Sequence, residues 1–390
     1  MPPLTCVVTI HGIGFQQPPV IDPDNPQRQI PGYADQLHTL LRQTGGLTSL
    51  GDDPERLKFG VKGPVYVQSP WNEPANGLGR LAPNRPLAVD HDGKPLENGI
   101  AHVAVVYSGL DAIGPRLGST FDTVARVAWN FGAYAHPLSA AHMLAADLGA
   151  MLHPHPVVGQ APSVSLQPRR DLPAASASQP PPSHLHLMDM VHRVAPGAAT
   201  GGGTLSPTSH LNLFTTLEHD IASYICRNDL RERLRDFIQL VLTRLAERDD
   251  VGKIVINAHS QGAIVAVDAL GRYAPTKIRR LVTAGSPLRK YVDLFAWGNH
   301  VGELQKIATK DFWHNVYDPF DPVADPLVVQ QGWQPGKAID AQTAAPLMRC
   351  PITDQPVDNV ANSGGGLAAH NYWGNARQFI PYLADVIKNA

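Results

Sequence analysis

The chain has 390 residues, of which 32 are basic and 34 acidic, and its formal net charge is −2. Such a balance provides no basic surface for nucleic acid or for an anionic membrane. The length allows one large α/β domain with insertions or two ordinary domains, with a sizeable core in either case. Three cysteines (Cys6, Cys226 and Cys350) lie far apart without a C-x-x-C pair, so we expect buried free thiols, with neither a disulfide framework nor a thiolate metal site.

The amino terminus, MPPLTCVVTIHG, runs directly into an apolar strand pattern and lacks the basic stretch of a secretory signal. No apolar run approaches the roughly 18 residues that a membrane-spanning helix needs. We therefore expect a cytoplasmic protein without an integral membrane segment. The alternative is export by a route that uses no cleavable signal.

Apolar, β-rich runs alternate with helical patterns along the chain. The strand patterns cover residues 5–10, 102–107, 253–257, 278–284, 312–317 and 356–361. Apolar residues at three-to-four spacing predict helices over residues 32–43, 230–247, 263–273 and 372–389. This alternation predicts the α/β class, with a mostly parallel central sheet and helices on both faces.

Two segments interrupt the alternation. Residues 59–99 are rich in proline, glycine and asparagine, and Asp92-Gly93 predicts a hairpin turn, so we expect an ordered excursion beside the sheet. The longer segment, residues 110–209, has few aromatic residues to bury and contains proline and glycine runs. We expect it to form a lid or cap, partly low-complexity or mobile, on a core made of residues 1–109 and 210–390.

The segment KIVINAHSQGAIVAVDA, residues 253–269, is the most informative part of the chain. A β-branched run leads through a tight corner directly into a helical pattern, and Ala258 and Gly262 flank Ser260 by two positions. A sharp strand-to-helix turn needs small residues at those positions, and it exposes the serine hydroxyl. Ser260 is therefore the predicted nucleophile, although Ala258 replaces the first glycine of the usual G-x-S-x-G pattern.

The sequence HGIG at residues 11–14 forms a glycine-rich corner after the first predicted strand. Its backbone N–H groups can turn toward a ligand, so we assign the N–H groups of Ile13 and Gln261 as oxyanion donors. The residues expected to support the oxyanion loop and the serine turn are His11, Gly12, Gly14, Ala258 and Gly262. A dinucleotide fingerprint does not fit, because Gln17 stands where its third glycine is required.

A serine nucleophile needs a base and a carboxylate that orients the base. The sequence DPFDPVAD, residues 318–325, places three acids after a predicted strand, and we assign Asp321, with Asp318 and Asp325 as alternatives. His370 follows a glycine run before the last predicted helix, where a flexible loop can bring it to the serine. It is the predicted general base.

Other candidate residues have simpler interpretations. Side chains of consecutive residues diverge at a sharp turn, so we expect His259 to pack or to hydrogen-bond below the turn. Ser286 precedes a proline and no helical pattern follows it, which is typical of a turn. Eight histidines lie between His136 and His210 without an accompanying set of acids or cysteines, so no metal site is predicted.

The order of Ser260, Asp321 and His370 is the Ser, acid, His order of α/β-hydrolases. With TAGSPL at residues 283–288 and AHNYW at residues 369–373, the chain resembles an α/β-hydrolase of the bacterial lipase and esterase type. The resemblance implies cleavage of small-molecule or lipid esters through an acyl-enzyme, without a cofactor and with transient contact at a lipid interface. A phospholipase or acyltransferase with the same triad and a non-catalytic binding protein on this fold are the alternatives.

Overall fold

A computed structural model describes most of the predicted core. The described residues are 3–12, 18–22, 25–69, 77–107, 224, 228–289, 302–309, 311–321, 323–324, 326–329, 345–346, 350–363 and 369–390. The predicted lid, residues 110–209, lies outside them, and so does Cys226. Cys6 and Cys350 are buried free thiols, as predicted for these two cysteines.

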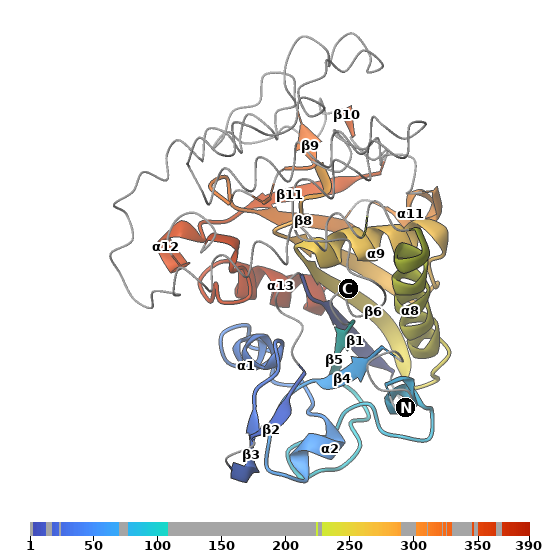
Figure 1. Cartoon of the computed structure of the whole chain (residues 1–390), viewed down its shortest axis with the longest axis vertical. Coiled ribbons are helices and arrows are strands. Elements are labelled where there is room, and N and C mark those ends of the chain that lie inside the picture. Colours follow the sequence, from blue (N-terminus) through green and yellow to red (C-terminus); the bar gives the residue numbers. More distant parts are fainter. Residues whose placement is uncertain are drawn as a thin grey trace.

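Seven parallel strands form the central sheet in the order β11-β8-β7-β6-β1-β5-β4 (Figure 1). Their bounds are β1 (Leu4–Ile10), β4 (Val65–Gln68), β5 (Ile100–Val106), β6 (Val251–His259), β7 (Ile278–Ala284), β8 (Trp313–Tyr317) and β11 (Ile352–Pro356). The central strands are rich in valine and isoleucine and are buried on both faces, which is typical of a parallel sheet between helical layers. The predicted α/β class is confirmed.

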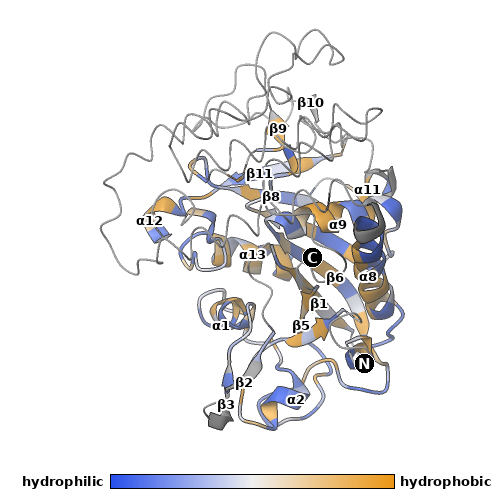
Figure 2. Ribbon diagram, in the orientation of Figure 1, coloured by the Kyte–Doolittle hydropathy of each residue, from blue (hydrophilic) through white to orange (hydrophobic). Residues whose placement is uncertain are grey.

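Helices cover both faces of this sheet (Figure 1). One face carries α8 (Asn228–Ala246), α9 (Gln261–Arg272) and α11 (Gly302–Ile307), and the other carries α1 (Asp35–Gln43) and α13 (Phe379–Lys388). Hydrophobic residues gather on the inner strands and on the helix faces that cover them (Figure 2). Within the described ranges, no helix is long and apolar enough to cross a membrane.

The remaining elements are short. They are α2 (Pro54–Leu57), the 3-10 helix η1 (Leu78–Leu81), α12 (Val360–Ser363), and two antiparallel pairs, β2 (Val20–Asp22) with β3 (Asn25–Ile30) and β9 (Val328–Val329) with β10 (Ala345–Pro346). They lie outside the main sheet and were not predicted.

The connections after β1 and β6 leave the sheet on opposite faces. The chain passes from β1 to α1 on one face, whereas β6 continues directly into α9 on the other. In open α/β sheets, ligands bind beyond the carboxyl ends of two such neighbouring strands. Gly12 follows β1 and Ser260 follows β6, so the topology brings two predicted site residues to this point.

The sheet contains two edge strands that the sequence analysis misjudged. Residues 59–99 do not lie only beside the sheet, because they supply β4, which pairs with β5. The strand predicted over residues 356–361 is wrong, since β11 ends at Pro356 and α12 begins at Val360. β4 has only four residues, and β11 is mostly polar and partly exposed, so neither strand has the long apolar run that identifies the central strands.

The last helix begins at Phe379 and not at Tyr372 as predicted. The side chain of Asn375 accepts hydrogen bonds from the main-chain N–H groups of Arg377 and Gln378, which holds this segment in turns. His370 therefore lies nine residues before α13, further from the helix than expected. The hairpin turn predicted at residues 92–93 is confirmed, with Gly93 at a φ of 79°.

Candidate active site

Ser260 occupies a sharp turn between β6 and α9. Its φ of 55° and ψ of −130° are rare for a residue other than glycine, and such a conformation costs about 1–3 kcal/mol. The Ser260 N–H donates to the carbonyl of Ala284 at 2.9 Å, and the Ser260 carbonyl accepts from the N–H of Ala263 at 3.0 Å. The neighbouring strand and the new helix thus hold the strained turn, the arrangement predicted for a serine nucleophile.

Two glycines allow the end of β1 to approach this turn. A Cβ atom on Gly262 would lie 2.2 Å from the His11 carbonyl oxygen, and one on Gly12 would lie 2.9 Å from Ser260 Oγ. The main chain after β1 therefore contacts the serine directly. Ala258 is fully buried in the core beneath α9, so its methyl group is accommodated where the usual pattern has glycine.

His370 and Asp321 form a buried pair. The Nδ1 atom of His370 donates to Oδ2 of Asp321 at 2.7 Å, and the carboxylate is fully buried. Asp321 also accepts from the Val323 N–H at 2.9 Å and from the Tyr372 hydroxyl at 2.9 Å. Burial alone raises the pKa of the Asp321 carboxyl, but the charge of His370 and these hydrogen bonds outweigh it, so the pKa lies below its usual value.

The loop that carries His370 packs on the serine turn. A Cβ atom on Gly285, the residue after Ala284, would lie 2.8 Å from Cε1 of His370. His259 Nε2 lies 2.9 Å from the His370 carbonyl oxygen. Because Nδ1 of His370 carries the proton that Asp321 accepts, Nε2 is the basic atom. It is buried without a hydrogen-bond partner among the described residues, so the bond to Ser260 is not formed here. Catalytic hydrogen bonds often close only when substrate binds.

The two alternative acids differ from Asp321. Asp318 is buried, and its carboxylate accepts hydrogen bonds from the main-chain N–H groups of Phe320, Asn359 and Val360. It therefore organises the loop between β8 and α12. Asp325 lies outside the described residues.

Of the two predicted oxyanion donors, only Gln261 lies within the described residues. Gln261 is the first residue of α9, where backbone N–H groups point out of the helix and the helix dipole favours negative charge. Ile13 and Gly14 lie outside the described residues. Among the supporting residues, His11 stacks on Tyr107 with ring centroids 4.0 Å apart, and Nδ1 of His11 lies 2.7 Å from the Gly12 carbonyl. Burial lowers the pKa of His11 to about 4, so this ring is neutral at pH 7.

Tyr372 has a role that the sequence analysis missed. Its hydroxyl donates to Asp321 and accepts from the Asp318 N–H at 2.7 Å, so it fixes both acids of the loop relative to each other. In the sequence, the only sign of this role is that Tyr372 lies two residues after His370. A tyrosine just before a helix more often packs its ring in the core to anchor the helix.

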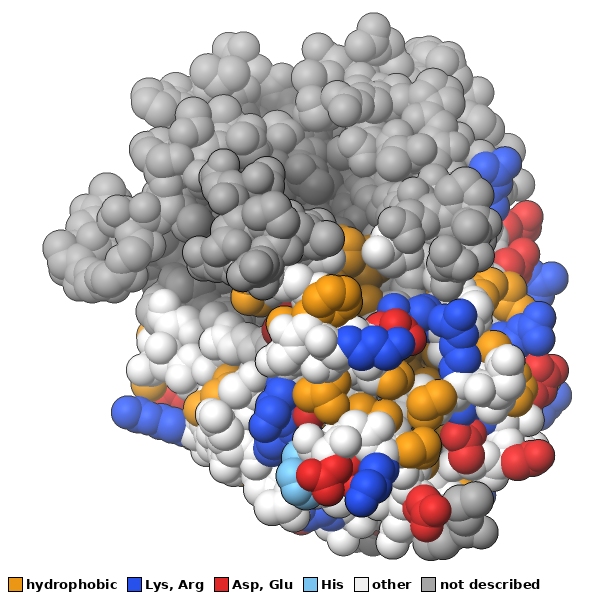
Figure 3. All heavy atoms as spheres, turned by 90° about the horizontal axis from the view of Figure 1, so that it is seen from below, with side chains coloured by type: hydrophobic (Ala, Val, Ile, Leu, Met, Phe, Trp, Pro, Cys, Tyr) orange, Lys and Arg blue, Asp and Glu red, His pale blue; other side chains and the backbone are white. Residues whose placement is uncertain are grey.

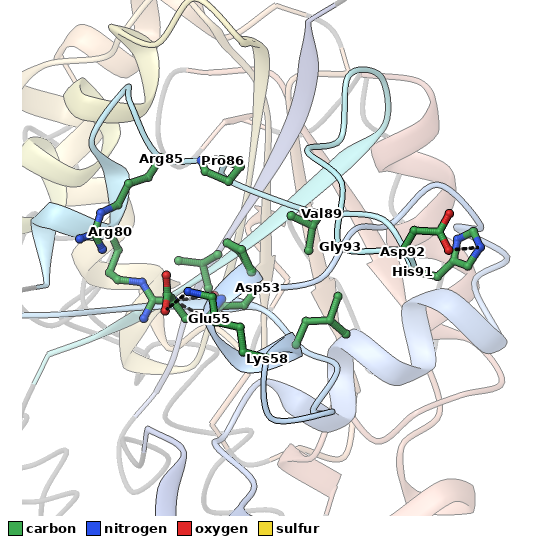
Figure 4. A pocket seen from close by; sticks show the side chains of 13 residues that line it. Asp53, Glu55, Lys58, Arg80, Arg85, Pro86, Val89, His91, Asp92 and Gly93 are labelled. Atoms are coloured by element: carbon green, nitrogen blue, oxygen red, sulfur yellow. Dashed lines mark hydrogen bonds and ion pairs between the residues drawn. The ribbon is translucent and has the colours of Figure 1, made fainter.

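A separate pocket of 590 Å³ lies at the β4 edge of the sheet. Val65, the first residue of β4, lines it together with Asp53, Glu55, Lys58 and Arg80 (Figure 4). Asp53 pairs with Arg80, and Glu55 pairs with Lys58. Figure 3 shows this lower face with acidic and basic side chains interspersed among apolar ones. The pocket therefore presents no concentrated charge, and Ser260, Asp321 and His370 are not among its lining residues.

Within the described residues, a group of three potential metal ligands occurs at Asp90, His91 and Asp92. They lie on the hairpin turn, where the Asp90 carboxylate already accepts the N–H groups of Asp92 and Lys94. Turn formation explains this cluster. The histidines at residues 136–210 lie outside the described residues.

Comparisons with protein-family models, with curated proteins and with solved structures find no significant match to this chain. An α/β sheet supports many unrelated chemistries, so the fold class does not identify an activity. Function must therefore be inferred from the side chains at the carboxyl ends of the strands.

Proposed function

We propose that this protein is a serine hydrolase that cleaves carboxylic esters through an acyl-enzyme on Ser260. One observation carries the proposal: a strained serine turn and a buried acid–histidine pair meet on either side of Gly285. A serine hydroxyl becomes nucleophilic only beside a base, and the base needs a carboxylate to fix its tautomer. These three groups come from segments far apart in sequence, which makes a chance meeting a poor explanation.

In the proposed reaction, Nε2 of His370 removes the proton of Ser260 as Oγ attacks the ester carbonyl. Asp321 stabilises the imidazolium that forms, and His370 then gives the proton to the leaving alcohol. The N–H groups of Gln261 and Ile13 would hold the negative oxygen. Water, activated by the same histidine, attacks the acyl-enzyme and releases the acid and the free serine.

The fold proposed for this activity is that of the α/β-hydrolases. The parallel sheet, the strand-turn-helix at Ser260 and the Ser, acid, His order all support it. We propose lipid esters as the preferred substrates, with residues 110–209 as the lid of the acyl site. The apolar segments at residues 124–131 and 138–151 of that insertion motivate this part of the proposal.

Hydrolysis of p-nitrophenyl esters tests the activity directly. Ser260→Ala should lower kcat on the order of 10⁶-fold, because the nucleophile is lost while the rest of the site remains. Ser69→Ala is the matched control, since Ser69 is also buried directly after a parallel strand, and it should keep wild-type activity. A fluorophosphonate probe should label the wild type and the control but not Ser260→Ala. Equal labelling of all three, or activity in Ser260→Ala, would contradict the proposal.

A series of acyl chain lengths tests the substrate class. Each buried methylene contributes about 0.8 kcal/mol, so an apolar acyl site should favour chains beyond about eight carbons. A preference for acetate would exclude lipid esters and leave the esterase proposal in place. Competing alcohols and phospholipid vesicles in the same assay identify an acyltransferase or a phospholipase by their products.

A further inference from the structure

His259 contacts the segment that carries the general base. Its Nε2 lies 2.9 Å from the His370 carbonyl oxygen. A carbonyl oxygen only accepts hydrogen bonds, so Nε2 of His259 carries the proton and donates it. The two imidazole rings lie with centroids 4.6 Å apart and planes 38° from each other. His259 is buried, and Trp373 packs on it at 5.0 Å.

The turn at residues 369–370 is thus held at two successive carbonyls. Asn359 Nδ2 donates to the Ala369 carbonyl at 2.7 Å, and His259 donates to the next one. The ring of His370 is fixed separately through Nδ1 by Asp321. With the main chain and Nδ1 both held, the direction of the basic Nε2 atom is determined. His259 precedes Ser260, so the tether joins the base to the element that carries the nucleophile.

We infer that His259 is a positioning residue, which holds the backbone of the general base His370 in register with Ser260. The inference rests on the proposed function, because His370 needs this register only if it serves the serine. In this role His259 neither transfers a proton nor contacts the substrate.

The electrostatics suit this role. The groups that face His259 are His370, Asp321 and His11, with Tyr372 and Trp373 completing its surroundings. Burial, followed by the charge of His370, lowers the pKa of His259 to about 3. At neutral pH His259 therefore does not compete with His370 for the proton of Ser260. It also adds no positive charge beside the imidazolium that forms during catalysis.

Three substitutions separate the tether from simple packing. His259→Leu fills the space but has no donor, His259→Asn has a donor on a side chain that is too short, and His259→Gln places an amide nitrogen near the position of Nε2. A displacement of about 1 Å at a catalytic group can cost 100-fold in rate. We expect kcat to fall about 10- to 100-fold in the Leu and Asn variants with KM nearly unchanged, and to recover to within about threefold of wild type in the Gln variant.

His314→Leu is the matched control. His314 Nε2 also lies 2.9 Å from a backbone carbonyl, that of Asp311, but at the opposite end of β8 from the loop that carries Asp321. This variant should keep wild-type kcat. Thermal unfolding midpoints report folding, and proton NMR reports the His370 Nδ1–H that is bonded to Asp321. That resonance should be broadened in the Leu and Asn variants and retained in the Gln variant.

The possible results are distinct. Wild-type kcat in His259→Leu, or equal impairment of folded Asn and Gln variants, would overturn the inference while ester hydrolysis by the wild type stands. If the His259→Leu variant does not fold, the difference in kcat between the His259→Asn and His259→Gln variants still tests the inference. If the wild type hydrolyses no ester, the proposed function fails, and an unchanged NMR resonance across the three variants would then reject the tether as well.

Discussion

The part of the chain that the structure describes contains two buried histidine–aspartate pairs. In one, His370 bonds to Asp321 at the carboxyl ends of the strands. In the other, His38 of α1 lies 3.1 Å from Asp52 on the same face of the sheet. Both carboxylates are buried, and both have a pKa below the usual value. The presence of an acid–histidine pair therefore does not distinguish the two sites.

The difference lies in the second nitrogen of each ring. His38 uses both nitrogens, because Nε2 donates to Asp52 and Nδ1 lies 3.1 Å from Nδ1 of His102. His102 is itself occupied at Nε2 by the hydroxyl of Thr9 at 2.8 Å. His370, by contrast, has a buried Nε2 without a partner among the described residues, and it lies against the serine turn. A histidine whose lone pair is already engaged cannot act as a base, so the first network is structural and the second is suited to chemistry.

Neutralising each acid in turn should give opposite results. Asp321→Asn should lower kcat for ester hydrolysis about 10⁴-fold, because the amide no longer fixes the tautomer of His370 or stabilises its charge. Asp52→Asn should leave kcat unchanged and lower the free energy of unfolding by about 3 kcal/mol, because Arg42, 2.9 Å from the carboxylate, loses its buried partner. Kinetics and chemical denaturation of both variants measure the two effects. Loss of activity in both would show that the His38 network also serves catalysis.

A smaller loss is expected when the ring of His370 is displaced without changing its acid. Gly285→Ala places a methyl group 2.7 Å from Cε2 of Tyr372 and 2.8 Å from Cε1 of His370 at a φ of 61°, so the rings that hold the acid–histidine pair must shift and kcat should fall about 100-fold. Gly93→Ala is the matched control, since Gly93 also has a positive φ of 79° but nothing within 4 Å of the added atom. Backbone strain alone should destabilise both variants. If kcat also falls equally in both, the proposed contact with His370 is not the cause.

The parts of the fold that the sequence predicts are those with strong local signals. The segments that form β1, β6 and β7 are long and rich in β-branched residues. The small residues on either side of Ser260 are those that a crowded strand-to-helix turn requires. β4 was missed because its apolar run is only three residues long and lies in a segment rich in proline and glycine, and β11 was misplaced because its sequence, ITDQP, has few apolar residues. The start of α13 was predicted too early because the apolar residues keep a helical spacing from Tyr372 onward. The side chain of Asn375 accepts the N–H groups of Arg377 and Gln378 and holds this segment in a turn, so the helix begins only at Phe379.

For the candidate site, the sequence predicts which residues take part and the order in which they occur along the chain, but not their contacts. Ser260, Asp321 and His370 each stand in a motif, and the pairing of Asp321 with His370 agrees with that assignment. The sequence favoured Asp321 but left Asp318 and Asp325 as alternatives, because only three-dimensional contacts show that Asp321 meets the imidazole of His370 while Asp318 accepts main-chain N–H groups. The bonds from Tyr372 to Asp321 and from His259 to the backbone of His370 have no sequence pattern, since each depends on how separate segments pack.

The smallest expected effect concerns the pH dependence of stability. Burial lowers the pKa of His102 well below its usual value, and the charge of neighbouring His38 lowers it further. Below pH 6.5 the unfolded chain binds a proton at His102 that the folded chain does not bind, so the folded state loses stability as the pH falls from 6.5. The slope approaches about 1.4 kcal/mol per pH unit for each such histidine. Replacing His102 with Gln should reduce the slope between pH 6 and 4.5 by up to this amount. Urea denaturation at each pH measures this slope. An unchanged slope would mean that His102 is protonated in the folded protein, so that its Nε2 could not accept a hydrogen bond from the Thr9 hydroxyl.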